Sequence, residues 1–118
     1  AARGGNKSRR YLYSGSNSLG YVAWYEENSG YKTHAVKTKS PNELGIYDMS
    51  GNVWEWCQDW YRRYSSAAVT NPIGPASGTW RVNRGGGWSG NAAYCRAAFR
   101  FNGSPGYRYS FSGVRLAR

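Results

Sequence analysis

Large rings and polar side chains alternate through the middle of the chain, and this period of two predicts strands. Residues 53–61 read Val-Trp-Glu-Trp-Cys-Gln-Asp-Trp-Tyr, the alternation expected of a half-buried strand. Other runs predict further strands at residues 34–37, 81–84, 95–100, 107–111 and 113–116. Residues 21–25 fit either a strand or a helical turn, and no segment keeps a helical period convincingly. The pattern therefore predicts a chain built mainly from short strands.

Gly, Pro, Asn and Ser separate these runs and predict turns and loops. Turns are expected at residues 40–42 and 48–52, a long connection at 63–78, and a short strand with a loop within 1–20. Leu, Ile, Val and Phe contribute only fifteen of the 118 residues, but six Trp and eleven Tyr supply the apolar area that a core needs. We expect a single domain over residues 1–118 with irregular strands and long ordered loops.

The segment 80–118 alternates a stiff frame with small polar and aromatic residues. The frame comprises residues 81–82, 84–86, 95–98 and 113–116. If the stretch before the last frame piece is extended, Tyr107, Tyr109 and Phe111 share one face. Rings give large contact area at low entropic cost, and small polar residues give adaptable hydrogen bonds. This composition predicts a surface that binds another molecule.

Charge is unevenly divided along the chain. All six acidic residues lie within residues 26–59, whereas the chain from Trp60 onward has nine arginines and neither lysine nor acid. This balance indicates an acidic, aromatic or nucleic-acid partner. The alternative is that frame arginines pair internally or stack on rings, above all Arg84, Arg96, Arg100 and Arg115. Arg108, flanked by two tyrosines, is the better candidate for a ligand contact.

The remaining reactive residue types are few. Cys57 and Cys95 form either one disulfide or two buried thiols, and their spacing does not support a zinc site. His34 lies in a Lys/Thr-rich stretch and is expected to be a solvated loop residue. No apolar run approaches 18 residues, so no membrane span is predicted.

Three motifs carry a resemblance to a known family. Residues 42–61 read NELGIYDMSGNVWEWCQDWY, and Arg-Gly-Gly follows at 84–86 and Gly-Val-Arg-Leu at 113–116. This combination, together with the opening Ala-Ala-Arg-Gly-Gly, resembles the formylglycine-generating-enzyme (sulfatase-modifying factor) branch of the C-type lectin fold. The resemblance implies an α+β fold with little regular secondary structure, of which this chain is the C-terminal part or a minimal version.

The resemblance also implies a calcium site, because the family binds calcium at the matching positions. The candidate ligands are Asp48, Gly51, Val53 and Glu55. Asp48 and Glu55 carry hard oxygen donors, and the intervening turn can direct backbone carbonyls inward, as a calcium ion requires. The alternative is that Glu55 pairs with a frame arginine and Asp48 caps the turn.

The enzymes of this family oxidise a substrate cysteine with a copper ion held by two cysteines shortly after the Arg-Gly-Gly turn. Residues 87–94 of this chain contain no cysteine. Soft thiolates are the ligands that Cu(I) prefers, so the copper site and its chemistry are not expected here. The resemblance therefore predicts a non-enzymatic protein, with an enzyme that uses different residues as an alternative.

One group of proteins on this fold is diversified by retroelements that randomise template adenines, and residues 80–118 resemble such a variable region. The resemblance implies a non-enzymatic protein that displays a diversified aromatic surface, with a protein as its ligand and a nucleic acid as the alternative partner. Phe99 is the position that could instead belong to the core. The candidate ligand-binding residues are Trp88, Ser89, Gly90, Asn91, Tyr94, Phe99, Phe101, Asn102, Gly103, Ser104, Gly106, Tyr107, Arg108, Tyr109, Ser110, Phe111 and Ser112.

Overall fold

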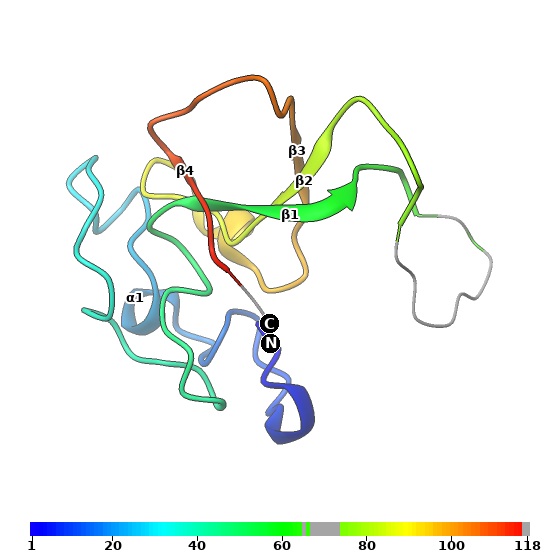
Figure 1. Cartoon of the computed structure of the whole chain (residues 1–118). Coiled ribbons are helices and arrows are strands. Elements are labelled where there is room, and N and C mark those ends of the chain that lie inside the picture. The colour runs from blue at the N-terminus through cyan, green and yellow to red at the C-terminus, as the bar shows by residue number, and fades with distance from the viewer. Residues whose placement is uncertain (65, 67–73, 117–118) are drawn as a thin grey trace.

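A four-stranded sheet organises the second half of the chain (Figure 1). The computed structural model describes residues 1–64, 66 and 74–116; half of the connection expected at 63–78 lies outside these residues, as do positions 117 and 118. The elements in chain order are the 3-10 helix η1 (Gly5–Lys7), helix α1 (Leu19–Val22), strands β1 (Trp54–Trp60) and β2 (Arg81–Arg84), the 3-10 helix η2 (Ala92–Cys95), and strands β3 (Phe101–Gly103) and β4 (Ser112–Gly113).

The strands lie in the order β3-β2-β1-β4. Strand β2 is antiparallel to both β1 and β3, and β4 is parallel to β1 with Ser112 opposite Trp54. The parallel pairing of β4 brings the end of the chain back to the beginning of β1. The strands predicted at 53–61 and 81–84 are confirmed, because β1 covers residues 54–60 and β2 covers residues 81–84.

The strand predicted at 95–100 is wrong. Helix η2 ends at Cys95, and Asn91 begins it by accepting a hydrogen bond from the Ala93 N–H at 3.0 Å. Cys95 packs tightly against Gly86, which has φ +74° and where an added Cβ would lie 2.7 Å from the Cys95 Sγ. The chain bends to place Cys95 there, and the strand begins only at Phe101.

The predicted strands near the C-terminus are also largely wrong. Residues 107–109 form no regular element, residues 110–111 lie in a turn, and only Gly113 of the run 113–116 belongs to a strand. The N–H groups of Tyr107 and Ser112 donate to carbonyls three residues earlier, at 3.1 and 3.2 Å. These local hydrogen bonds replace the ladder that an extended segment would make.

The first half of the chain is mostly ordered loop. Residues 21–22 belong to helix α1, so the helical alternative for 21–25 is the correct one at its start. The strand predicted at 34–37 is wrong, because the Asn52 side chain takes both backbone groups of His34, at 2.9 and 3.0 Å. Within residues 1–20, the expected strand is reduced to a single bridge between Tyr13 and Ser16.

The buried apolar cluster lies between α1 and η2. Leu19, Val22, Ala23 and Cys95 form it, and half-buried tyrosines pack around it. Ser50 is buried beside the cluster, where its hydroxyl donates to the Cys95 carbonyl at 2.9 Å. Because small side chains and a hydroxyl fill this centre, aromatic rings provide much of the remaining packing.

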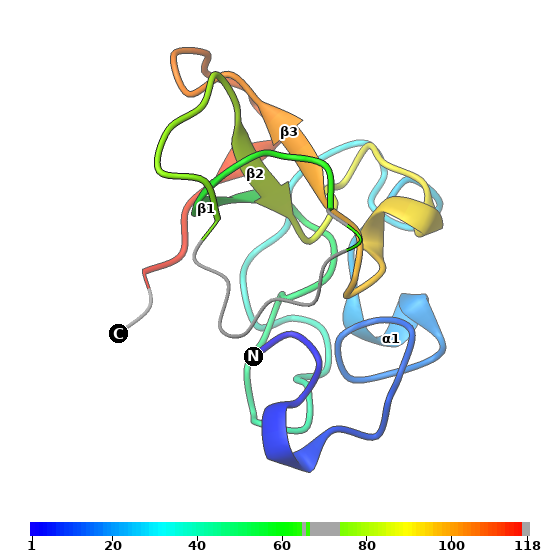
Figure 2. The same cartoon turned by 90° about the vertical axis from the view of Figure 1, so that its right-hand side faces the viewer.

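The segment between β3 and β4 and the segment around η1 lie at opposite ends of the molecule (Figures 1 and 2). Both views place the segment between β3 and β4 above the sheet and the segment around η1 below it. No helix among the described residues is long and apolar enough to cross a membrane.

Candidate functional site

Three rings between β3 and β4 stack in series. Tyr107 and Tyr109 have centroids 6.0 Å apart with an 18° angle between their planes, and Tyr109 and Phe111 have centroids 4.9 Å apart at 17°. The Trp54 N–H donates to the Phe111 carbonyl at 2.8 Å, which fixes this aromatic row to the edge of β1. The three rings lie side by side although the segment is not the extended strand on which the prediction depended.

A second group of rings adjoins the row through Trp54. Tyr94, Phe99 and Phe101 lie around this ring, with centroids 6.1, 6.1 and 5.5 Å from it. Trp54 is buried and Phe99 is half-buried, whereas Tyr94 is 39% and Phe101 50% exposed. Phe99 therefore supports the group from inside, and Tyr94 and Phe101 present its outer surface. The sequence did not single out Trp54 as this support, although the Trp-Glu-Trp alternation pointed to a buried ring.

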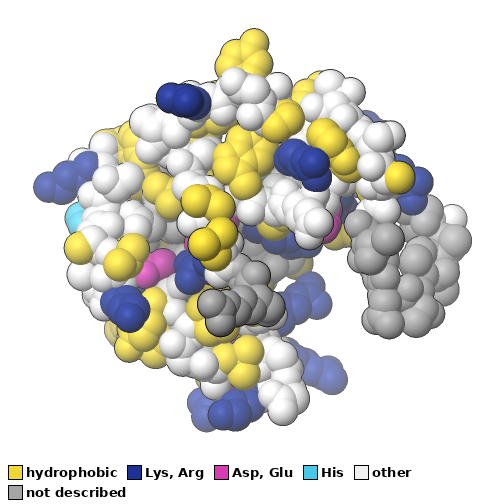
Figure 3. Space-filling view, viewed as in Figure 1, with side chains coloured by type: hydrophobic (Ala, Val, Ile, Leu, Met, Phe, Trp, Pro, Cys, Tyr) yellow, Lys and Arg dark blue, Asp and Glu magenta, His cyan; other side chains and the backbone are white. Residues whose placement is uncertain are grey.

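Most of the predicted ligand-binding residues reach the surface. The exposed ones are Ser89, Asn91, Tyr94, Phe101, Gly106, Tyr107, Arg108 and Ser110, and the half-buried ones are Trp88, Phe99, Asn102, Ser104, Tyr109, Phe111 and Ser112. Figure 3 shows hydrophobic side chains gathered over the upper part of this view, where the β3–β4 segment lies. The structure thus brings many of the predicted residues together on one surface.

Two predicted ligand-facing positions, Gly90 and Gly103, are buried, which corrects the prediction for both. An added Cβ at Gly103 would lie 2.7 Å from the Trp56 ring, so only a glycine lets the β3 backbone pass this close to the ring. The Gly90 carbonyl accepts from the Glu26 N–H at 3.1 Å and joins the two halves of the chain. Both glycines serve packing and hydrogen bonding within the fold.

The frame arginines make hydrogen bonds and ring contacts with other parts of the chain. Arg84, Arg96 and Arg100 donate to the carbonyls of Phe99, Ala93 and Arg62 at 3.3, 3.3 and 3.0 Å. Arg100 also lies over two tyrosine rings, and Arg81 lies 3.6 Å from the centroid of Trp60. The internal-pairing alternative is confirmed for these arginines, and Arg108 remains exposed.

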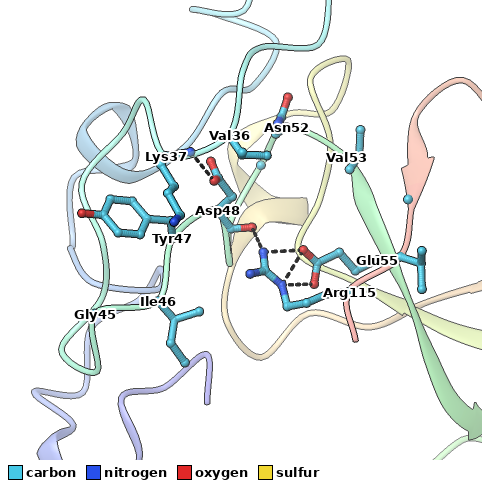
Figure 4. A pocket seen from close by; sticks show the side chains of 13 residues that line it. Val36, Lys37, Gly45, Ile46, Tyr47, Asp48, Asn52, Val53, Glu55 and Arg115 are labelled. Atoms are coloured by element: carbon cyan, nitrogen blue, oxygen red, sulfur yellow. Dashed lines mark hydrogen bonds and ion pairs between the residues drawn. The ribbon is translucent and has the colours of Figure 1, made fainter. Parts of the chain in front are cut away.

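Arg115 forms the single salt bridge found among the described residues (Figure 4). Its guanidinium meets the Glu55 carboxylate through Nε at 2.9 Å to both oxygens and through Nη2 at 2.6 Å, and it also donates to the Asp48 carbonyl at 3.1 Å. Hydrogen bonding to Glu55 raises the pKa of Arg115 above its usual value. The pair closes one side of a cavity of about 480 Å³.

The two carboxylates among the predicted calcium ligands therefore already have other partners. The Asp48 carboxylate accepts the Lys37 N–H at 2.8 Å, and Glu55 holds Arg115. Figure 4 shows the Asp48 carboxylate directed toward Lys37 and its carbonyl toward Arg115. A calcium ion needs six to eight free oxygens around one point, so the residues in this arrangement do not fit it. Calcium at Asp48, Gly51, Val53 and Glu55 stays a prediction that requires Arg115 to move.

Both cysteines are free thiols, so the disulfide alternative is not realised. Burial raises the pKa of Cys95 to about 12 and also raises the pKa of Cys57. His34, expected in solvent, is half-buried: it stacks on Trp24 with centroids 3.7 Å apart, and its Nε2 lies 2.7 Å from the Ser29 carbonyl oxygen. The described residues contain no group of three or more His, Cys, Asp or Glu side chains suited to a metal.

Comparison with known proteins identifies relatives of the whole chain. A formylglycine-generating enzyme of Streptomyces coelicolor is 34% identical over 99% of this chain and 43% of its own length. The solved structure of Treponema denticola variable protein 1 matches with a TM-score of 0.86 and 46% identity, over 96% of this chain and 41% of that chain. PvdO from Pseudomonas aeruginosa matches with a TM-score of 0.76 and 27% identity, over 96% of this chain and 46% of its own.

The chain thus spans about two fifths of the length of these proteins. The α+β, C-type lectin fold of the formylglycine-generating-enzyme type, expected from the motifs at 42–61, 84–86 and 113–116, is confirmed by these matches. The model of the sulfatase-modifying factor enzyme 1-like domain matches residues 1–118, and the chain belongs to this family.

Proposed function

We propose that this chain is a non-enzymatic domain that binds a protein ligand through a diversified aromatic face. The face consists of Tyr94, Phe101, Tyr107, Tyr109 and Phe111. The observation that carries the proposal is the 46% identity to Treponema denticola variable protein 1 over 96% of this chain, at a TM-score of 0.86. The residues between 80 and 118 that matched a variable region in composition form much of one surface around these rings.

The geometry of the face suits binding. Stacked rings are held in place before a ligand arrives, so little conformational entropy is lost on binding. Each ring has a large apolar area, and a tyrosine adds a hydroxyl that can hydrogen-bond. Tyr107 is 65% exposed, so a ligand can cover most of it. Ser89, Asn91 and Ser110 are exposed and offer adaptable polar contacts.

Enzymatic oxidation of a cysteine is not supported by these residues. The stretch 87–94 has no cysteine, and burial raises the pKa of both thiols, which keeps them protonated at neutral pH. A thiolate is the form that binds copper or attacks a substrate. The proposal therefore assigns Cys95 a packing role and gives neither cysteine a catalytic one.

A protein ligand is favoured over a nucleic acid by the arginines. Phosphate binding needs guanidinium groups that are free to face the ligand. Arg84, Arg100 and Arg115 instead donate to carbonyls or a carboxylate of the chain itself. Rings then provide most of the contact, and a few of them are expected to dominate the affinity.

Two measurements test the proposal. The DNA beside the gene should contain a near-copy of the segment that encodes residues 80–118, differing where that copy carries adenine. Immobilised protein should capture a ligand from its native surroundings that Tyr107→Ala loses, with an affinity loss of about 2 kcal/mol or more. Tyr21→Ala is the matched control, because Tyr21 is 71% exposed on the first half of the chain.

The outcomes separate the alternatives. Capture that survives nuclease treatment and depends on Tyr107 but not Tyr21 supports a protein ligand. Capture that disappears with nuclease and weakens steeply with salt supports the nucleic-acid alternative. If Tyr107→Ala instead lowers the free energy of unfolding strongly, the ring belongs to the core and the proposed face is wrong.

A further inference from the structure

A basic cavity of about 620 Å³ lies away from the aromatic face, between the N-terminal segment and the residues that follow η2. Arg3, Ser8, Arg10, Tyr11 and Leu12 line it from one side, and residues 96–98 line it from the other. The Ala97 N–H donates to the Leu12 carbonyl at 3.0 Å and joins the two sides. In Figures 1 and 2 the N-terminal segment lies at the opposite end of the sheet from the β3–β4 segment.

The lining carries three guanidinium groups, from Arg3, Arg10 and Arg96, and no carboxylate. The nearby carboxylate of Glu43 is directed elsewhere, since it accepts the Arg9 N–H at 3.0 Å and lies against Gly4. Like charges brought together in this way repel one another, so the arrangement favours a bound anion. Figure 3 shows Lys and Arg side chains along the lower side of the molecule, where this segment lies.

The donors of the cavity are largely unused within the described residues. Arg96 donates through Nε to the Ala93 carbonyl at 3.3 Å, and no side-chain hydrogen bond of Arg3 or Arg10 occurs in the part of the chain that the structure describes. Arg10 has φ +59°, a left-handed conformation that is strained for a non-glycine residue. The Ser8 hydroxyl accepts the Arg10 N–H at 3.2 Å and stabilises this turn.

We propose that this cavity binds the phosphoryl group of a small molecule. A phosphate dianion has enough oxygens to meet several guanidinium groups, and the planar guanidinium matches pairs of its oxygens. A carboxylate, with two oxygens and one charge, would satisfy fewer of these donors. The hydroxyls of Ser8 and Tyr11 add neutral donors at the wall. The site does not depend on the aromatic face, and either can exist without the other.

Titration of the chain with inorganic phosphate, at constant ionic strength with chloride as the balancing ion, tests the proposal. We expect saturable binding at one site by calorimetry, and saturable amide shifts confined to residue 3 and residues 8–12 and 96–98 by NMR. Arg3→Gln/Arg10→Gln should weaken phosphate binding at least about tenfold, because it removes two charged hydrogen-bond donors from the site. Arg62→Gln/Arg63→Gln removes the same charge elsewhere and should leave the affinity nearly unchanged.

Thermal unfolding of each variant shows whether it is folded. Arg10→Lys keeps the charge but loses the planar guanidinium that can bind two phosphate oxygens at once, so it should bind phosphate with intermediate affinity. The amide shifts of the unmodified chain test the site even if a variant fails to fold. Amide shifts that never saturate, or an equal loss in the Arg62/Arg63 variant, would overturn the proposal in favour of diffuse charge. Binding of a thymidine oligonucleotide without binding of inorganic phosphate would overturn it in favour of a polynucleotide surface.

Discussion

Removing the Arg115 guanidinium tests whether an internal cation holds the end of the chain to β1. Arg115 follows β4 and joins Glu55 of β1 to the carbonyl of Asp48. The substitution Arg115→Gln retains a polar side chain, although a shorter one, and removes the charge and most donors. It leaves the Glu55 carboxylate without its partner and frees the segment after β4. The folded state should therefore lose stability, while the sheet itself persists.

The size of this loss follows from exposure. The Arg115 side chain is 35% exposed and the Glu55 side chain 20%, so water screens the pair partly. A fully exposed pair contributes about 0.2–1 kcal/mol, and a hydrogen bond to a charged group up to about 3 kcal/mol when it is buried. An intermediate value of about 1–2 kcal/mol is expected. For a domain of this size, each kcal/mol lowers Tm by about 3–6 °C.

Urea unfolding of the four proteins in a double-mutant cycle, with Arg115→Gln, Glu55→Gln and the double variant, measures this pair directly. We expect a coupling free energy of about 1 kcal/mol that decreases in 1 M salt. A coupling near zero at low salt, with both single variants as stable as the parent, would show that the ion pair does not form in solution.

The same variant tests the predicted calcium ligands. An ion that binds the folded state raises its stability by mass action. Because Arg115 and calcium would compete for Glu55, calcium should raise Tm more for Arg115→Gln than for the parent, relative to chelator and with magnesium as the control. Calcium stabilisation of the parent that equals or exceeds that of the variant would contradict the position of Arg115 described above.

Three further results are expected. Gly86→Ala should lower the free energy of unfolding by about 2 kcal/mol or more in urea titration, because φ is +74° and the new methyl group would collide with Cys95. Gly20→Ala is the control: nothing lies within 4 Å of its Cβ, so the free energy of unfolding should not fall. Thiol labelling at pH 7 should be slow at Cys57 and slower at Cys95, because burial raises the pKa of Cys57 and raises that of Cys95 to about 12. The labelling rate should rise with pH as more thiolate forms, and fast labelling of Cys95 in the native state would contradict its burial. Asn52→Ala should cost about 2–4 kcal/mol by thermal unfolding, since it leaves two backbone groups without partners; an unchanged Tm would contradict this account.

Local alternation was enough to predict the centre of the sheet. Both strands form where the sequence predicts them, although burial does not alternate strictly along either: Gln58 and Asp59 are both exposed in β1, and Val82 and Asn83 are both buried in β2. The Gly-Asn turn before β1 and the glycines at 85 and 86 mark changes of direction in a way that composition alone reveals. These features depend on neighbours in sequence, and sequence patterns describe such neighbours well.

The loops of the first half depend on partners that lie far away in sequence. Asn42 donates to the carbonyl of Ala1, 41 positions earlier, and its Oδ1 accepts the N–H groups of Leu44 and Ile46. Asn52 does the same for His34 across 18 positions. An amide side chain that replaces a strand partner leaves no periodic signal, so residues 34–37 resembled a strand and His34 a solvated residue.

The site could be predicted in kind but not in detail. Ring composition identified the face, yet the same composition could not separate Gly103, which packs under Trp56, from the exposed Gly106. The cavity that contains Arg3, Arg10 and Arg96 was missed, because its two sides are more than eighty positions apart. Only the packed chain brings those charges together.

The hydrogen bonds that hold the aromatic row explain how its side chains can vary on a constant fold. Three backbone bonds fix the row: Tyr107 N–H to Ser104, Ser112 N–H to Tyr109, and Trp54 N–H to Phe111. None of them uses a side chain of the row. Replacement of a ring therefore changes what the face presents, while the backbone beneath keeps its partners. A surface built this way can accept many side chains at small cost in stability, which is the property that the proposed diversified binding function requires.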